Sequence, residues 1–147
     1  MLNFDEMLSD LGKNLEIELA FNEDGVCELL MDEKAVISLI KNEKDGVLTL
    51  SSVVADELPD PVGYSLILDL LDFSLGSAIS HSPAVGRDPE TGLLVAYQIV
   101  TASLLTTRAF TEIFHDFTRF CSGISAAIAN NLQVGPDELH GGSVIRV

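Results

Sequence analysis

The residues that most often perform chemistry in proteins are few in this chain and far apart. The histidines His81, His115 and His140 show no HExxH spacing, and no cysteine pair accompanies them to complete a zinc site. Cys27 and Cys121 could form one disulfide, but isolated cysteines at apolar positions in a reducing compartment are usually buried thiols. We therefore expect no metal, no cofactor and no functional cysteine.

The sequence also contains only incomplete forms of the motifs found in common enzymes. The turn from Gly86 to Gly92 lacks the Gly-Lys-Ser/Thr ending of a phosphate-binding loop. Ser125 follows Gly123, but the second glycine of a nucleophile elbow is missing and the serine falls within a predicted helix. The acidic pairs at positions 32–33 and 56–57 stand in turns without the spacing of a calcium loop. The sequence therefore favours a binding protein without catalytic residues over an enzyme.

Net charge is the most informative bulk property. The 147 residues include 23 acidic and 8 scattered basic ones, which gives a formal net charge of -15. Binding to nucleic acids or anionic membranes requires clustered lysines and arginines, so neither is an expected partner. Because 47% of the residues are hydrophobic, the chain is expected to fold, and its charge would keep an exposed apolar surface soluble. An ordinary acidic protein would explain the composition equally well.

The ends of the sequence bear on location. The first residues lack the order of a secretory signal, and no apolar run reaches the roughly 18 residues of a membrane span. We expect a cytoplasmic protein with a single domain at residues 1–134. The Gly-rich residues 135–147 are expected to form a flexible tail.

Turns and apolar periodicity predict the elements that would carry any site. Helical spacing of apolar residues predicts helices at residues 4–15, 62–75 and 107–130. Short apolar runs between turn residues predict a β-meander with strands at residues 17–21, 26–31, 35–41 and 47–54. A later hairpin combines a strand at residues 93–100 with an irregular arm at residues 79–85, which contains Pro83.

The second predicted helix is apolar on two sides. One side carries Tyr64, Ile67, Leu68, Leu71 and Leu75, and the nearly opposite side carries Val62, Leu66, Leu70 and Phe73. Such a helix must be covered twice, so we expect the sheet on one side and a second subunit on the other. We assign Leu66, Leu70 and Phe73 to the homodimer interface, although periodicity alone does not decide between the two sides.

The order of these elements resembles the class I type III secretion chaperones, the family that includes the Tir chaperone. The resemblance spans nearly the whole chain and is carried by Phe21-Asn22-Glu23-Asp24-Gly25-Val26-Cys27, by Leu58-Pro59 and by Arg87-Asp88-Pro89-Glu90-Thr91-Gly92. It implies an α+β fold, an antiparallel twisted sheet flanked by three helices in the order α-β-β-β-α-β-β-α, which forms homodimers partly through the second helix. The Gly-rich end and the arm before Arg87 depart from the family pattern.

The resemblance also implies a function in the bacterial cytoplasm. Members of this family hold the N-terminal region of a secreted effector in extended form, which keeps it soluble and competent for secretion. They deliver it to the secretion machinery and hydrolyse no ATP themselves. Because of this delivery, the secretion ATPase is a further candidate partner. The alternative is an acidic dimeric adaptor unrelated to secretion, which would bind a folded partner.

Strand alternation indicates where such a segment would bind. If Cys27, Leu29 and Met31 face the core, alternate residues of the first two long strands leave apolar side chains outside. Together with the first helix, these strands offer apolar contacts beside a strand edge, a common way to hold an extended peptide. We predict effector contacts at Leu2, Phe4, Leu8, Leu30, Val36 and Ile40. Helical periodicity places Phe4 and Leu8 in the core equally well.

Overall fold

The computed structural model describes residues 3–102 and 105–130. Its elements run in the order α1 (Phe4–Leu15), β1 (Val26–Met31), β2 (Ala35–Asn42), β3 (Val47–Ala55), α2 (Tyr64–Ser80), β4 (Ala84–Arg87), β5 (Leu94–Thr101) and α3 (Thr107–Asn130). The α+β class and the element order implied by the family resemblance are therefore confirmed. None of the helices in these two stretches is long and apolar enough to cross a membrane. Leu2 and the predicted tail at residues 135–147 lie outside the described residues.

Helix α1 has clear chemical signals at both ends. At its start, the side-chain oxygen of Asn3 accepts a hydrogen bond from the backbone N–H of Asp5 at 2.8 Å, which caps the helix. At its end, Glu16 adopts a left-handed conformation with φ of 60° and its N–H bonds to the carbonyls of the last turn. The helix buries one face, formed by Phe4, Met7, Leu8 and Leu11.

The prediction of a strand at residues 17–21 is wrong. This segment is an irregular connection between α1 and β1, whose backbone is bound to the helix: the N–H of Ile17 donates to the carbonyl of Gly12 at 2.9 Å. A Cβ on Gly12 would lie 2.6 Å from the carbonyl oxygen of Ile17, so only glycine permits this approach. Leu19 and Phe21 still pack against the core, which explains the apolar alternation that suggested a strand.

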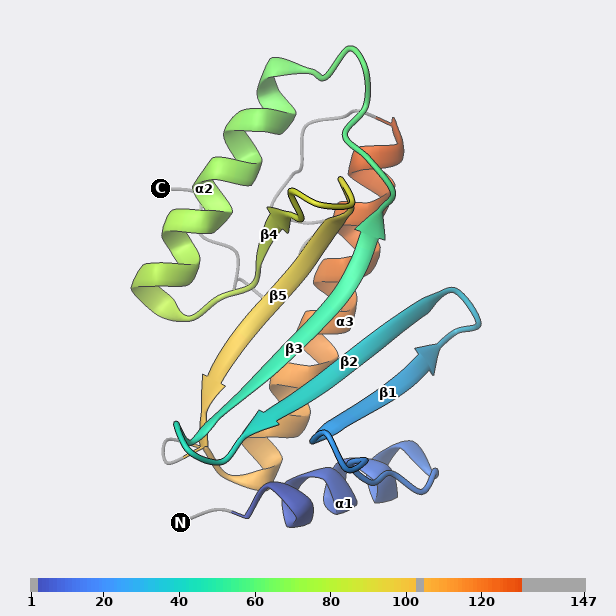
Figure 1. The fold of residues 1–147 in the computed structure, drawn as a ribbon, viewed down its shortest axis with the longest axis vertical. Coiled ribbons are helices and arrows are strands. Elements are labelled where there is room, and N and C mark those ends of the chain that lie inside the picture. The colour runs from blue at the N-terminus through green and yellow to red at the C-terminus, as the bar shows by residue number, and fades with distance from the viewer. Residues whose placement is uncertain (1–2, 103–104, 131–147) are drawn as a thin grey trace.

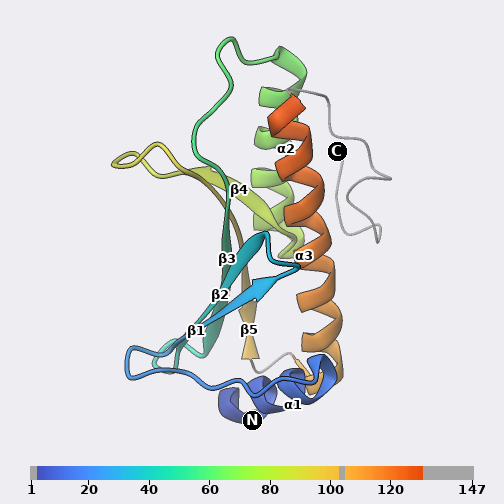
Figure 2. The same cartoon turned by 90° about the vertical axis from the view of Figure 1, so that its right-hand side faces the viewer.

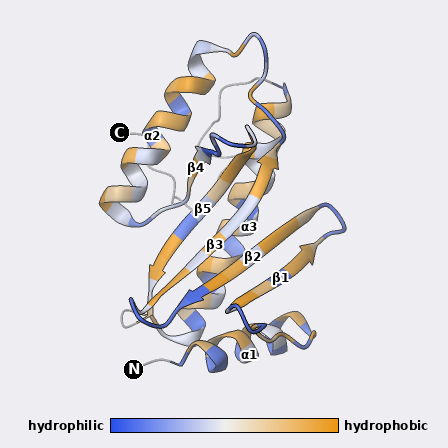
Figure 3. Cartoon of the chain, in the orientation of Figure 1, coloured by the Kyte–Doolittle hydropathy of each residue, from blue (hydrophilic) through white to orange (hydrophobic). Residues whose placement is uncertain are grey.

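The five strands form one antiparallel sheet in the order β1-β2-β3-β5-β4 (Figure 1). The late hairpin of β4 and β5 thus extends the early meander, because β5 pairs with β3. The register of β3 with β5 shifts between Val53 and Ala55, a β-bulge near the end of β3. Figure 3 shows apolar residues concentrated along the strands and polar residues in the turns that join them.

Both α2 and α3 lie on the same side of the sheet (Figure 2). Helix α3 passes behind the strands and supplies the largest buried side chains, among them Phe110, Phe114, Phe117 and Phe120. In the described residues no helix covers the opposite side of the sheet, so a two-layer arrangement leaves one sheet face to solvent.

The region before Arg87 also differs from its prediction. Helix α2 continues to Ser80, five residues beyond the predicted end, and stops where His81 turns left-handed with φ of 59°. The predicted arm at residues 79–85 is therefore split between the helix and a short edge strand. Pro83 is buried immediately before β4, and a proline at this position removes no ladder hydrogen bond from the strand.

Candidate functional site

The uncovered side of the sheet, here called the open face, carries the outward side chains of β1, β2, β3 and β5. Cross-strand pairing arranges them in rows: Val26 pairs with Ile40, Ile40 with Thr49, and Thr49 with Ile99. A more polar row of Glu28, Ser38, Ser51 and Tyr97 follows. The next row pairs Leu30 with Val36 in β1 and β2, and Val53 with Val95 in β3 and β5.

The open face exposes large apolar side chains that a monomer would normally cover. The exposed fractions are 63% for Leu30, 47% for Val36 and 38% for Ile40. Cys27 and Leu29, between them in β1, are buried, so the predicted alternation of the first two long strands is confirmed. Clustered exposed apolar residues of this kind mark interaction surfaces more often than ordinary solvent-facing surface.

The other predicted contacts are placed differently. Phe4 and Leu8 are buried in the core beneath α1, so they are not accessible to a partner, in agreement with the alternative left open by helical periodicity. Leu2 lies outside the described residues. The accessible part of the predicted site is therefore the sheet.

Two exposed residues of the open face were missed from sequence. Val53 of β3 is 50% exposed and Ile99 of β5 is 47% exposed. Alternation gave a signal for both, since their neighbours Ser52, Val54, Gln98 and Val100 are buried. The pairing of β5 with β3, which brings Ile99 to this face, joins segments about fifty residues apart and cannot be read from local pattern.

The interface residues assigned on α2 face the chain's own core. Leu66 and Phe73 are 1% and 3% exposed, and Leu70 packs partly against the same core. Leu66 and Phe73 are thus covered within one chain, and the interface assignment itself stays a prediction. The opposite side of α2 is the accessible one, an exposed stripe of Tyr64, Leu68, Leu71, Leu75 and Ile79.

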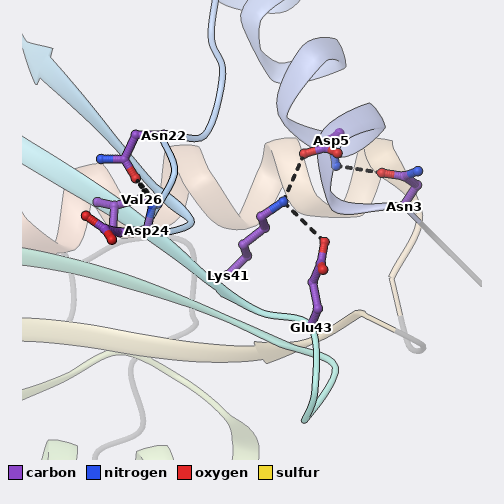
Figure 4. Close-up of polar contacts among 7 residues, drawn as sticks. All are labelled: Asn3, Asp5, Asn22, Asp24, Val26, Lys41 and Glu43. Atoms are coloured by element: carbon purple, nitrogen blue, oxygen red, sulfur yellow. Dashed lines mark hydrogen bonds and ion pairs between the residues drawn. The ribbon is translucent and has the colours of Figure 1, made fainter.

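Lys41 in β2 links the sheet to α1 and to the irregular connection that follows α1. Lys41 Nζ lies 3.3 Å from Asp5 Oδ1 in α1 and 3.2 Å from Glu43 Oε1 (Figure 4). It also stands 4.9 Å from the centre of the Phe21 ring, a cation–π contact. The hydrogen bond with Glu43, and then that with Asp5, raises the pKa of Lys41. The contacts join three segments that are separate in sequence.

Both cysteines are free and buried, as predicted. Burial raises the pKa of the Cys27 thiol and raises that of Cys121 to about 12. Thiolates are the reactive form of cysteine, so such thiols are poor nucleophiles near neutral pH. Within the described residues no three His, Cys, Asp or Glu side chains gather in a way that would hold a metal ion. The open face offers apolar contacts in two rows and polar groups in the row between them.

Comparison with known proteins identifies the fold. The model of the Tir chaperone protein (CesT) family matches residues 6–119. The chain is similar to a chain of the HopA1-SchA chaperone-effector complex, with a TM-score of 0.71 and 22% identity over 84% of this chain and 94% of that one. No curated protein sequence matches it.

Two further solved structures share the fold. The ExsC-ExsE complex has a chain with a TM-score of 0.68 and 19% identity, covering 84% of this chain and 92% of that one. The Yersinia pestis type III secretion chaperone SycH, in complex with a fragment of YscM2, gives a TM-score of 0.67 and 17% identity over 83% of this chain and 99% of that one. Because the family model matches most of the sequence, the chain belongs to the Tir chaperone protein (CesT) family.

Proposed function

We propose that this protein is a type III secretion chaperone that binds the N-terminal region of a secreted effector in extended form and keeps it soluble and competent for secretion. The observation that carries the proposal is the open face, with Leu30, Val36, Ile40, Val53 and Ile99 exposed together on a sheet side that no described helix covers. Membership of the Tir chaperone family and likeness to the HopA1-SchA complex support it.

The shape of the open face favours an extended partner. Its apolar residues form rows across several strands instead of lining one enclosed pocket, so side chains along an extended segment would meet them in succession. Each large aliphatic side chain covered in this way contributes about 1.5–3 kcal/mol from apolar surface removed from water. The formal net charge of -15 would keep such a surface soluble before the partner arrives.

We also propose that the active form is a homodimer joined through the exposed stripe of α2. The stripe residues recur at spacings of four and three positions, so they form one continuous apolar line along the helix. It lies on the helical side of the sheet, away from the open face, so dimerisation would leave the binding surface accessible.

The test of the function is partner capture followed by substitution. The tagged protein is purified from its native cell, and the co-purifying protein is identified and produced as a purified N-terminal segment. Leu30→Glu, Val36→Glu, Ile40→Glu and Val53→Glu should each raise its Kd about tenfold or more, because each change removes an apolar contact and buries a carboxylate. Ile17→Glu is the matched control, since Ile17 is 50% exposed but lies outside the sheet.

Two results would contradict the proposal. One is wild-type affinity in all four sheet variants. The other is a partner that resists proteolysis and keeps its free-state circular dichroism in the complex, which would favour the adaptor that binds a folded protein. An extended bound segment should instead be cleaved readily when free and be protected in the complex.

A further inference from the structure

The sheet is split where β2 and β3 diverge. Their pairing runs from Asn42 opposite Val47 to Ser38 opposite Ser51 and goes no further. Residues 35–37 of β2 still pair with β1, and β3 continues to Ala55 while pairing with β5. Within the described chain, these two strand segments therefore have a partner on one side only. Figure 1 shows β2 leaning away from β3 here, with α3 visible behind them.

A cavity of about 530 Å³ occupies this divergence, here called the β2–β3 gap. Its walls are Ala35 and Ile37 of β2 and residues 52–54 of β3, and the hairpin between β1 and β2 closes one end. Its floor is α3, which presents mainly small side chains there, Ser122, Ser125, Ala126 and Ala129. The volume lies within the roughly 300–1,000 Å³ of ordinary binding sites.

A buried hydroxyl whose partner is a thiol lines the gap. Ser52 is 4% exposed and lines the gap, and its Oγ finds no nitrogen or oxygen partner among the described residues. Its hydrogen-bonding partner is the Cys121 thiol, which is a weak one. A thiol satisfies a buried hydroxyl only weakly, so a backbone group of a bound strand would be a stronger partner for Ser52. The β-bulge at residues 53–55 lies next to it, and bulges are common beside binding sites.

The mouth of the gap near the end of β3 is acidic. A neighbouring cavity of about 410 Å³ shares Val54, Ser125 and Ala129 with the gap and is bordered by three carboxylates, those of Asp56, Glu57 and Asp60. A chain that leaves the gap in this direction passes these carboxylates, which favour lysine or arginine at that point.

We propose that the β2–β3 gap is a second binding site, which takes an extended strand of the partner polypeptide with small aliphatic side chains followed by a basic residue. The strand lies between residues 35–37 and 52–54 and pairs with their backbone groups on the side facing the gap, apart from the Val54 carbonyl, which accepts a hydrogen bond from Ser125 Oγ at 3.0 Å. Its inward side chains rest on the small residues of α3, and Ser52 bonds to it. That the bound strand belongs to the partner polypeptide rests on the proposed function. The existence of the site is inferred from the β2–β3 gap alone.

An inserted strand would give residues 35–37 and residues 52–54 the second neighbouring strand that each of them lacks. Neighbouring strands lie about 4.7–4.9 Å apart, and unpaired strand edges are templates for a further strand. Because β2 and β3 are antiparallel, an inserted strand runs antiparallel to one and parallel to the other, and both arrangements form backbone hydrogen bonds. Backbone pairing gives affinity, and the small floor selects small side chains.

A synthetic peptide tests the site without the native partner. The probe has seven residues, alternating valine and threonine with two lysines at one end, and is titrated into the full-length protein. We expect saturable binding with a Kd at or below about 1 mM. Backbone amides within residues 35–37 or 52–54 should become protected from hydrogen exchange. No binding, or binding with neither segment protected, would overturn the proposal.

Matched peptides and variants separate strand pairing from other contacts. A peptide with the same side chains but N-methylated alternate amides should not bind, and one ending in two glutamates should bind at least threefold more weakly. Ala126→Trp, at an exposed position on the floor, should abolish binding, whereas Glu112→Trp, exposed on the same helix outside the gap, should not. Ser52→Ala should weaken binding about three- to tenfold, the loss expected for one hydrogen bond.

Other occupants give different results. If a chain truncated after residue 130 binds the peptide but the full chain does not, the protein's own C-terminal segment fills the gap and the proposal is wrong. Protection of the gap that rises with protein concentration in the absence of peptide would assign it to a second copy. Failure of the open-face variants to weaken effector capture, with intact peptide binding, would count against the proposed function alone.

Discussion

The rings of Phe73 and Phe120 meet edge to face, with centroids 5.3 Å apart and planes inclined by 82°. This contact joins α2 to α3 and turns the Phe73 side of α2 towards the core. It explains why a helix that is apolar on two sides keeps the stripe through Leu71 exposed. The dimer interface is therefore proposed on the side opposite to the one assigned from sequence.

Phe73→Ala should lower the free energy of unfolding by about 3–5 kcal/mol, because it removes a buried ring and leaves a cavity. Urea denaturation monitored by circular dichroism measures the loss. Ile17→Ala removes an apolar side chain at a half-exposed position and should change stability by no more than about 0.5 kcal/mol. Equal losses in the two variants would show that the Phe73–Phe120 contact does not hold α2 in place.

Leu71→Asp should convert the proposed dimer to a folded monomer. Leu71 is 62% exposed, so the substitution leaves the core intact while placing a carboxylate in the apolar interface. Sedimentation velocity at micromolar concentrations should show half the wild-type mass, with an unchanged circular dichroism spectrum. Ser74→Asp adds the same charge at an exposed position beside the stripe and should remain dimeric. A monomeric wild-type protein would exclude this interface.

Cys121 should make stability fall at alkaline pH. Its pKa is raised by burial from 9.0 to about 12, so above pH 9 the unfolded chain loses this proton while the folded chain keeps it. The contribution is complete below the unfolded pKa, declines between about pH 9 and pH 12 and is lost above the folded pKa. The free energy of unfolding of Cys121→Ala should therefore fall less steeply than that of wild type over this range. Parallel curves would contradict the assignment.

Lys41→Met should destabilise the junction of α1 and the sheet by about 1 kcal/mol, because exposed ion pairs and cation–π contacts each contribute about 0.2–1 kcal/mol. The loss should shrink at high salt, which screens the contacts to Asp5 and Glu43. Lys13→Met is the control, since Lys13 pairs with Asp10 at 3.8 Å in an exposed position. A loss for Lys13→Met as large as that for Lys41→Met would argue against a joining role for Lys41.

Local pattern was a good guide wherever a segment's own side chains decide its conformation. The helical spacing of apolar residues predicted α1 and α3 with their bounds. Alternation correctly placed Leu30, Val36 and Ile40 on the exposed face of the sheet. The segment at residues 17–21 misled because it alternates like a strand while its backbone bonds to Gly12 in α1.

Tertiary contacts decided the rest, since they depend on residues far apart in the chain. Sequence alone determined the fold class, the acidity, the buried thiols and an apolar side on each element. It did not determine that Phe120 would cover the Phe73 side of α2, or that β5 would bring Ile99 to the open face. Nor did it show that β2 and β3 part beyond Ser38 and Ser51. Periodicity records which faces of an element are apolar, and only the packed chain determines which of them remain uncovered.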